Sequence, residues 1–244
     1  MRVVSLVPSL TELLYHLSVN VVGITKFCIH PAEWYRTKPR VGGTKNPDIQ
    51  RIKELSPDLI IANKEENRKE DVEQLSKLSR VLVTDITNIK DALTVIRLIG
   101  KECNAAHAAN CLVHSIAELW KPLQGSADGI RVLYLIWRKP YMVAGTDTYI
   151  HSVLQYLGFT NVVQESRYPQ LEAQAIRDLQ PDVVFLSSEP YPFREKHLSE
   201  LIEIAPSANV RLVDGEAFSW YGYRMIPAAE YFYTLIKDLK SIKK

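Results

Sequence analysis

The chain has 244 residues, of which 46% are hydrophobic, so it is long enough to form one large or two ordinary domains with substantial cores. Its 30 Lys and Arg against 28 Asp and Glu give a formal net charge of +2. This balance argues against a nucleic acid as partner, because nucleic-acid-binding domains carry clustered basic residues. No apolar run reaches the length of about 18 residues that a membrane-spanning helix needs.

The first 90 residues alternate predicted strands and helices. The strands are expected at 3–7, 21–25, 59–62 and 81–84, and the helices at 9–17, 46–55 and 69–78. Ser9 and Glu12 have the spacing of a capping box, and Asn46–Pro47 is typical of a helix start. This alternation predicts an N-terminal α/β lobe with a parallel sheet.

From about 91 to 123 the pattern is almost entirely helical, with Gly100 as a candidate join. Residues 104–123 alone would span about 30 Å at the helical rise. The segment is rich in Ala and Leu rather than in the Gly, Ser and Pro of flexible linkers. We therefore expect one long, rigid connecting helix.

Strand and helix patterns return in the last part of the chain. Strands are expected at 132–137, 183–185 and 211–213, and helices at 149–157, 198–204 and from 227 onward. The predicted organisation is an N-terminal lobe over 1–90, a connecting helix over 91–124 and a C-terminal lobe over 125–244.

One ten-residue segment occurs twice, at 52–61 and again at 176–185. Each copy has the end of a helix, a Pro-Asp break (Pro57–Asp58 and Pro181–Asp182) and a short apolar strand. Proline ends the helix because it lacks an amide donor and restricts the residue before it. Strands that are apolar at every position are typical of sheets covered by helices on both faces. The predicted fold class is therefore α/β, with two Rossmann-like lobes whose sheets are parallel, and a ligand site is expected in the cleft between them.

Several motifs along the chain resemble one family. They are Ser5–Glu12, Val22–Gly23, Asn46–Asp48 and Leu55–Ala62, followed by the mid-chain helix. This ordered set resembles the substrate-binding proteins of ABC importers for vitamin B12 and iron–siderophores, the helical backbone metal receptors. The resemblance covers essentially the whole chain. It implies a metal chelate bound between the lobes, and carboxylates on both lobes that dock onto the membrane permease.

A second set of motifs is similar to one subgroup of this superfamily, whose members often have no obvious leader. The set is Phe27–Pro31, Gly42–Pro47, Ala62–Asn67, Ser188–Phe193 and Phe218–Arg224. Here too Met1–Arg2 leads directly into a predicted strand, without the pattern of a signal peptide. We expect a periplasmic or envelope location if a leader has been removed, and a cytoplasmic one if the chain is complete as shown.

Ligands of doubly wound sheets contact the loops after the carboxyl ends of the strands. The predicted ligand-binding residues in those loops are Pro8, Ser9, Phe27, Cys28, His30, Asn63, Glu65, Glu66, Trp137, Arg138, Glu189, Tyr191, Trp220, Tyr221 and Arg224. Aromatic side chains with a few polar groups suit a flat tetrapyrrole-like or catecholate ligand. The competing interpretations are a core position for Trp137, a surface ion pair for Arg138 and capping of local carbonyls for Arg224.

Cysteine and histidine also suggest metal ligands, but no resident metal is predicted. Cys28 and His30, with Glu65 or Glu66, have suitable chemistry for zinc but lack a recognised spacing. Four residues form a stripe on the connecting helix: Cys103, His107, Cys111 and His114. The stripe spans about 16 Å, too far for all four to reach one ion, although an adjacent pair could do so with help. We expect it to be half-buried against the lobes.

The resemblance also implies permease-docking carboxylates, which we assign to Glu70 and Glu195. Each follows a predicted strand and lies near a helix N-terminus, where acidic residues also occur for dipole reasons alone.

The leading hypothesis is a non-enzymatic, monomeric solute-binding protein without an intrinsic cofactor. It would capture a metal chelate, a corrinoid first and a ferric siderophore or haem second, for import by an ABC permease. The alternative is a cytosolic carrier or sensor of a corrinoid or metal. An enzyme using Glu65, Glu66 and Glu189 is a third hypothesis, but the sequence contains no nucleophile elbow or phosphate-binding glycine loop.

Overall fold

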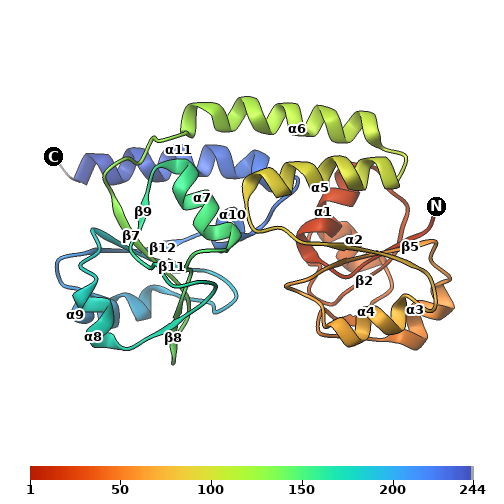
Figure 1. The fold of residues 1–244 in the computed structure, drawn as a ribbon, viewed down its shortest axis with the longest axis horizontal. Coiled ribbons are helices and arrows are strands. Elements are labelled where there is room, and N and C mark those ends of the chain that lie inside the picture. Colours follow the sequence, from red (N-terminus) through yellow and green to blue (C-terminus); the bar gives the residue numbers. More distant parts are fainter. Residues whose placement is uncertain (243–244) are drawn as a thin grey trace. The chain divides into compact units, whose positions relative to one another are not determined.

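The computed structural model describes residues 1–242, which form two compact units. Unit 1 comprises Met1–Ile86, Lys90–Ile116 and Tyr221–Arg224, and unit 2 comprises Thr87–Ile89, Ala117–Trp220 and the chain from Met225 onward. Both units are layered α/β structures with a central sheet (Figure 1). The predicted α/β class is therefore confirmed.

Unit 1 contains a sheet of four parallel strands. In spatial order they are β2 (Val21–Ile24), β1 (Val3–Ser5), β5 (Leu59–Asn63) and β6 (Arg80–Thr84). A small antiparallel pair, β3 (Gly42–Gly43) and β4 (Asn46–Pro47), lies outside this sheet. The helices are α1 (Pro8–His16), α2 (Ala32–Thr37), α3 (Ile49–Leu55), α4 (Lys69–Leu75) and most of α5 (Ile89–Glu102).

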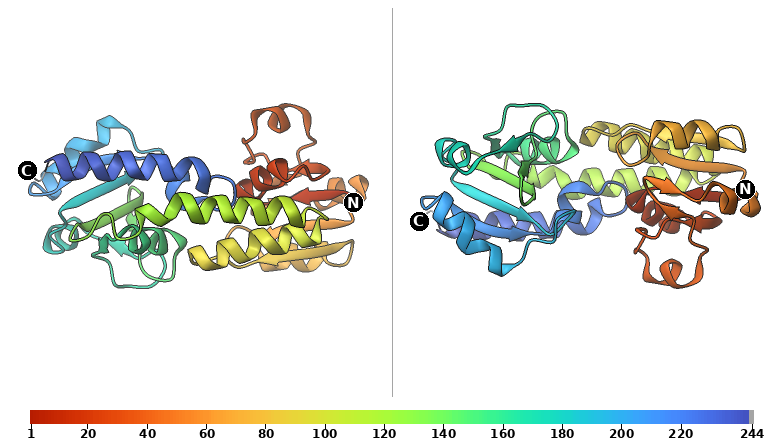
Figure 2. Two further views of the ribbon diagram at one scale, coloured as in Figure 1. Left: turned by 90° about the horizontal axis from the view of Figure 1, so that it is seen from above. Right: turned by 90° about the horizontal axis from the view of Figure 1, so that it is seen from below.

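Helices cover both faces of the unit 1 sheet, as the apolar strands predicted. Val4 and Ile60 point to the face where Ile52 of α3 and Leu75 of α4 complete a buried cluster. Alternate strand residues point to the opposite face, where α1 lies (Figure 1). In both views of Figure 2 the short helix α2 projects from the body of this unit.

Two helix starts in unit 1 differ from the sequence prediction. The N-cap of α1 is Val7, with Pro8 at the first helical turn, and no side chain caps the helix. The expected capping box is wrong because the helix begins before Ser9, which is therefore not its N-cap, and Glu12 bonds elsewhere. Similarly, Asp48 rather than Asn46–Pro47 caps α3, by accepting the Arg51 N–H at 2.9 Å.

Unit 2 contains a mixed sheet of six strands, so the expected parallel arrangement holds for only part of the sheet. The order is β10 (Gln170–Leu171), β8 (Tyr141–Val143), β7 (Arg131–Trp137), β11 (Val183–Ser187) and β12 (Asn209–Val213), with β9 (Thr160–Asn161) also beside β7. Strands β7, β11 and β12 are parallel, whereas β8 and β10 join antiparallel. Only three residues connect β7 to β8, and a connection that short cannot cross over to make a parallel pair.

Helices cover both faces of the unit 2 sheet as well. The helical elements are η1 (Lys121–Leu123), α7 (Tyr149–Leu157), α8 (Ala173–Asp178), η2 (Glu195–His197), α9 (Leu198–Ile204), α10 (Gly215–Ser219) and α11 (Met225–Ile242). Helices α8 and α9 lie on one face, and α7, α10 and α11 lie on the other (Figure 1). On the latter face, Phe218 contacts Tyr134, Phe185 and Phe232, with ring centroids 4.8–5.7 Å apart.

The segment expected to be a single connecting helix consists of two, α5 and α6 (Ala106–Trp120). They are separated at Cys103–Ala105, where Asn104 has a left-handed φ of 57°. Gly100, the candidate join, lies inside α5, and a Cβ at that position would be 2.3 Å from the Ala109 Cβ. The glycine thus permits close packing of the two helices and does not itself interrupt the chain. Residues up to Ile116 in α6 belong to unit 1, and those from Ala117 belong to unit 2.

The repeated Pro-Asp segment makes the same contacts in both units. The Asp58 carboxylate accepts the Arg2 N–H at 2.6 Å, and the Asp182 carboxylate accepts the Arg131 N–H at 2.8 Å. The two guanidinium groups donate back to the carbonyls that end the preceding helices. Ser56 and Gln180 are the residues directly before the two prolines. Each has a left-handed φ of 45° and terminates the preceding helix or the turn that follows that helix. We call this arrangement the Asp–Arg clamp; it ties the repeat to the start of the neighbouring strand.

Among residues 1–242, we find no helix that combines the length and apolarity needed to cross a membrane.

Candidate functional site

In both units, the chain adds strands first on one side of the first strand and then on the other side. In unit 1 the chain moves from β1 to β2 and then returns to β5 on the other side of β1. In unit 2, β9 and β11 likewise lie on opposite sides of β7. Such switch points leave a crevice at the carboxyl ends of the strands, where α/β proteins bind ligands. The predicted site residues follow these strand ends, so we define the carboxyl edge of the sheet in each unit as a candidate site.

The loop after β5 in unit 1 is held by its own asparagines. The Asn63 N–H donates to the Asn67 side chain at 2.8 Å, and the Asn63 side chain accepts the Glu65 N–H at 2.8 Å. The Asn67 amide also donates to the Thr44 carbonyl at 2.8 Å. Both asparagines are buried, whereas Glu65 is exposed. Asn63 therefore shapes the loop, and the loop presents Glu65 at the surface.

Glu66, in the same loop, lies among groups that change its ionisation. Burial raises the pKa of its carboxyl, Glu65 raises it further and Lys45 acts in the opposite direction. Burial also raises the pKa of Tyr221, the charge of Glu66 adds to this, and a hydrogen bond with Ser9 opposes it. Tyr221 exposes only 8% of its surface and Ser9 only 5%. These contacts bring three of the predicted residues together within unit 1.

The loop after β2 presents an aromatic ring and buries its cysteine. Phe27 is 50% exposed, with the Lys26 ammonium 5.1 Å from the ring centroid. Cys28 has no exposed surface, and its sulfur lies 3.0 Å from the Thr11 hydroxyl and 3.2 Å from the Thr25 hydroxyl. Burial raises the pKa of its thiol. Cys28 therefore supports this loop and offers no thiol to a ligand, whereas the half-buried His30 and exposed Phe27 reach the surface.

Arg224 forms a two-pronged ion pair with Glu12 on α1. Its Nε and Nη2 donate to the two carboxylate oxygens at 3.1 and 2.8 Å, and the side chains are 18% and 9% exposed. This geometry is the strong, bidentate form of an arginine–carboxylate contact. Glu12 was missed from the sequence because it fits a capping box equally well. The pair fixes Tyr221–Arg224 within unit 1.

In unit 2 an aromatic group forms at the ends of β7 and β11. Trp137, the last residue of β7, is 39% exposed and contacts Tyr191 edge-on, with centroids 5.6 Å apart. Tyr191 also packs against Phe193 at 4.8 Å and His197 at 5.5 Å. The exposure of Trp137 contradicts the alternative of a core position. Trp137 and Tyr191 thus form an apolar surface supported by buried Phe193 and His197.

Next to this aromatic group, Arg138 is paired with Glu200 of α9. Its Nε and Nη2 lie 2.8 and 2.7 Å from the same carboxylate oxygen, and Tyr141 donates to the other one. Partial burial opposes ionisation of Glu200, but the bonds from Arg138 and Tyr141 outweigh it and lower the Glu200 pKa. The surface ion pair considered for Arg138 is therefore present. Its partner Glu200 could not be recognised from sequence, since it lies 62 residues away.

Glu189 accepts hydrogen bonds from the C-terminal end of α10. One carboxylate oxygen accepts the Ser219 hydroxyl at 2.6 Å and the Trp220 indole N–H at 2.8 Å. Trp220 is only 8% exposed, so the expected ring surface for a ligand is largely covered in this structure. Gly215 is required nearby, because a Cβ there would lie 2.9 Å from the Glu189 nitrogen.

The two proposed docking carboxylates are both exposed. Glu70 lies in the first turn of α4 in unit 1, and Glu195 is the first residue of η2 in unit 2. A cleft between the two carboxyl edges and a docking role for these carboxylates remain predictions.

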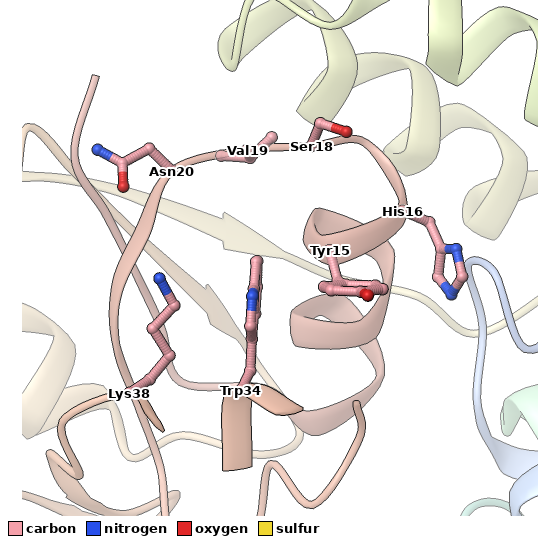
Figure 3. A pocket seen from close by; sticks show the side chains of 7 residues that line it. All are labelled: Tyr15, His16, Ser18, Val19, Asn20, Trp34 and Lys38. Carbon is pink, nitrogen blue, oxygen red and sulfur yellow. The ribbon is translucent and has the colours of Figure 1, made fainter. Parts of the chain in front are cut away.

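An open pocket of about 570 Å³ lies elsewhere in unit 1, and its lining includes Tyr15, Trp34 and Lys38. Figure 3 shows these three side chains close together, with His16 pointing away from Trp34 and Lys38. The pocket is lined by the end of α1 and by residues 18–20, just before β2. It therefore lies near the amino end of that strand, and it contains none of the predicted site residues.

Comparison with known proteins identifies the family. The protein-family model for periplasmic binding proteins matches residues 3–204. The vitamin B12-binding protein of Salmonella typhimurium is 26% identical over 195 residues, covering 77% of this chain and 73% of the relative. That of Pectobacterium carotovorum is 24% identical over 239 residues, covering 94% and 86%.

Solved structures show the same fold at lower identity. The vitamin B12 binding protein BtuF of Vibrio cholerae matches with a TM-score of 0.82 and 20% identity, covering 98% of this chain and 97% of that one. The apo heme-binding protein RhuT from Roseiflexus matches with a TM-score of 0.83 and 19% identity, covering 98% of each.

The chain belongs to the periplasmic binding protein family. The family resemblance predicted from the motifs is thereby confirmed, as is the class of a solute-binding protein rather than an enzyme.

Proposed function

We propose that this protein captures a metal chelate at the carboxyl edges of its sheets and delivers it to an ABC importer. A corrinoid is the first candidate, and a ferric siderophore or haem is the second. Family membership and relatives described as vitamin B12-binding proteins support import over the cytosolic carrier. Aromatic surface at the edges, with Phe27 in unit 1 and Trp137 in unit 2, is the observation that carries the proposal.

The charges at these edges favour a corrinoid. Arg138 and Arg224 are each paired with a carboxylate of the same unit. The positive charge of each guanidinium is therefore already balanced and does not call for an anionic ligand. Glu65 and the partly buried Glu66 add acceptors for the amide groups of a corrinoid. These two residues would instead repel the negatively charged propionates of haem or the anionic oxygens of a ferric catecholate.

The test is a titration of the purified chain with cobalamin, haem and a ferric catecholate, read by absorption and calorimetry. We expect cobalamin to bind most tightly. Trp137→Ala should weaken it about tenfold, the loss expected for one aromatic contact worth about 1–1.5 kcal/mol. Tyr233→Ala, which removes a 63% exposed ring from α11, is the matched control and should leave affinity unchanged. No binding of any of the three at tens of micromolar would overturn the proposal.

The importer partner has a separate test. Glu70 and Glu195 are proposed to contact basic residues of the permease, so Glu70→Ala with Glu195→Ala should abolish uptake while leaving chelate affinity intact. Unchanged uptake would contradict the docking role. Glu73→Ala, another exposed carboxylate on α4, is the control.

We further propose that the protein works in the cell envelope. Fractionation of cells that express the native gene tests this, and recovery of the protein only with cytoplasmic markers would contradict it.

A further inference from the structure

The exposed face of α6 carries a thiol and an imidazole that the proposed chelate site does not use. His107 and Cys111 lie one helical turn apart and are both exposed. The Cys111 sulfur is 3.7 Å from the His107 Nε2. The half-buried stripe expected from sequence is therefore wrong here, since both side chains face solvent.

The distance between the two donor atoms suits a tetrahedral metal ion. Zinc–sulfur bonds are about 2.3 Å and zinc–nitrogen bonds about 2.0–2.1 Å. For an ion at those distances from two donor atoms 3.7 Å apart, the sulfur–ion–nitrogen angle would be about 115°, close to the tetrahedral value. The separation of the two donor atoms is therefore one that a single ion can bridge.

We propose that His107 and Cys111 form an open binding site for a soft divalent ion of the zinc type, independent of the chelate site. Binding replaces the thiol proton, which is released to solvent, while neutral His107 supplies its ring nitrogen. Within residues 1–242 no group of three or more His, Cys, Asp or Glu side chains is placed to hold one ion. Two water molecules would therefore complete a tetrahedral coordination around the ion.

The other two residues of the stripe serve as controls. Cys103 is half-buried, and burial raises the pKa of its thiol to about 11, which disfavours the thiolate that binds metal. His114 is exposed on the same helix, but the imidazole that contacts the Cys111 sulfur is that of His107.

The experiment is a titration of the reduced, tag-free chain with Co²⁺ as a spectroscopic substitute for zinc. We expect one ion per chain, a thiolate-to-cobalt charge-transfer band in the near ultraviolet, and its loss on addition of Zn²⁺. Cys111→Ser should abolish the band, and His107→Ala should raise the apparent dissociation constant at least about tenfold, since even indirect partners of a metal contribute that much. Circular dichroism verifies that these exposed substitutions leave the fold intact.

Cys103→Ala and His114→Ala should retain the band. The proposal is overturned if wild type shows no band, or if the band survives Cys111→Ser. Protection of Cys111 from maleimide labelling by Zn²⁺ is an independent readout, and unchanged labelling would also contradict the site.

Discussion

The two units share a framework but differ at the edges where a ligand would bind. Both have a parallel centre, a switch point beside the first strand and an Asp–Arg clamp with nearly equal distances. Apart from the exposed Phe27, the unit 1 edge is polar and acidic, with the loop after β5 held by Asn63 and Asn67. The unit 2 edge is aromatic, with Trp137 and Tyr191 beside an ion pair. The repeated clamp contacts thus maintain the same framework in both units, while the loops after the strand ends differ in composition.

The cores of the units also differ. Unit 1 buries mainly aliphatic side chains around Ile52 and Leu75, whereas one face of unit 2 depends on edge-on and tilted aromatic rings around Phe218. The following predictions test how far this comparison extends, beginning with the largest effect.

Phe218→Ala should lower the free energy of unfolding by about 3–5 kcal/mol, because it leaves a cavity among three buried rings. Urea denaturation followed by circular dichroism measures the change. Tyr233→Ala is the aromatic control, and its effect should stay within about 0.5 kcal/mol because the ring is exposed. A loss below about 1 kcal/mol for Phe218→Ala would show that this face does not depend on its aromatic contacts.

Asp58→Ala and Asp182→Ala should each cost about 1 kcal/mol, since each removes the carboxylate that accepts an N–H at the start of a strand. The comparison predicts equal effects in the two units. Asp128→Ala, at an exposed turn, is the control. Urea denaturation measures both effects. If one substitution is neutral and the other is not, the two clamps are not equivalent.

The smallest expected effect is a pH dependence arising in unit 2. Burial lowers the pKa of both His151 and His197, and the Nδ1 of His197 accepts the Arg194 N–H at 2.9 Å. Because the unfolded chain binds protons at a pKa of about 6.5, their contribution to stability is present above that pH and is lost as the pH falls toward the folded values.

Unfolding by urea between pH 7 and pH 5.5 should therefore show falling stability, with a shallower fall for the His151→Gln/His197→Gln variant. Glu66 of unit 1 acts with the opposite sign, because its raised pKa favours the folded chain at low pH and that contribution is lost as the pH rises. A variant slope equal to that of wild type would contradict the assignment to these histidines.

Sequence patterns predicted the elements well where the pattern was local. The expected helices at 149–157 and 198–204 coincide with α7 and α9, and the two Pro-Asp strands lie where the repeat placed them. Errors occurred where one local pattern allows two outcomes. The capping-box spacing of Ser9 and Glu12 also fits a buried turn, and the helical run at 91–123 does not reveal the left-handed Asn104 that divides it.

Site residues were harder to predict for the same reason. Loops after strand ends could be located from the sequence, and the structure places Phe27, Glu65 and Trp137 at the surface. Whether a polar side chain is available depends on partners distant in sequence. Arg224 is committed to Glu12, 212 residues away, and Cys28 is enclosed by Thr11 and Thr25.

By itself the sequence determined the α/β alternation, the duplicated strand and the family resemblance, because periodicity, proline and apolar runs act on the neighbouring backbone. Only the tertiary structure decided the strand order, the Asp–Arg clamps and the pairing of each arginine. These depend on contacts between residues far apart along the chain, which no local pattern contains.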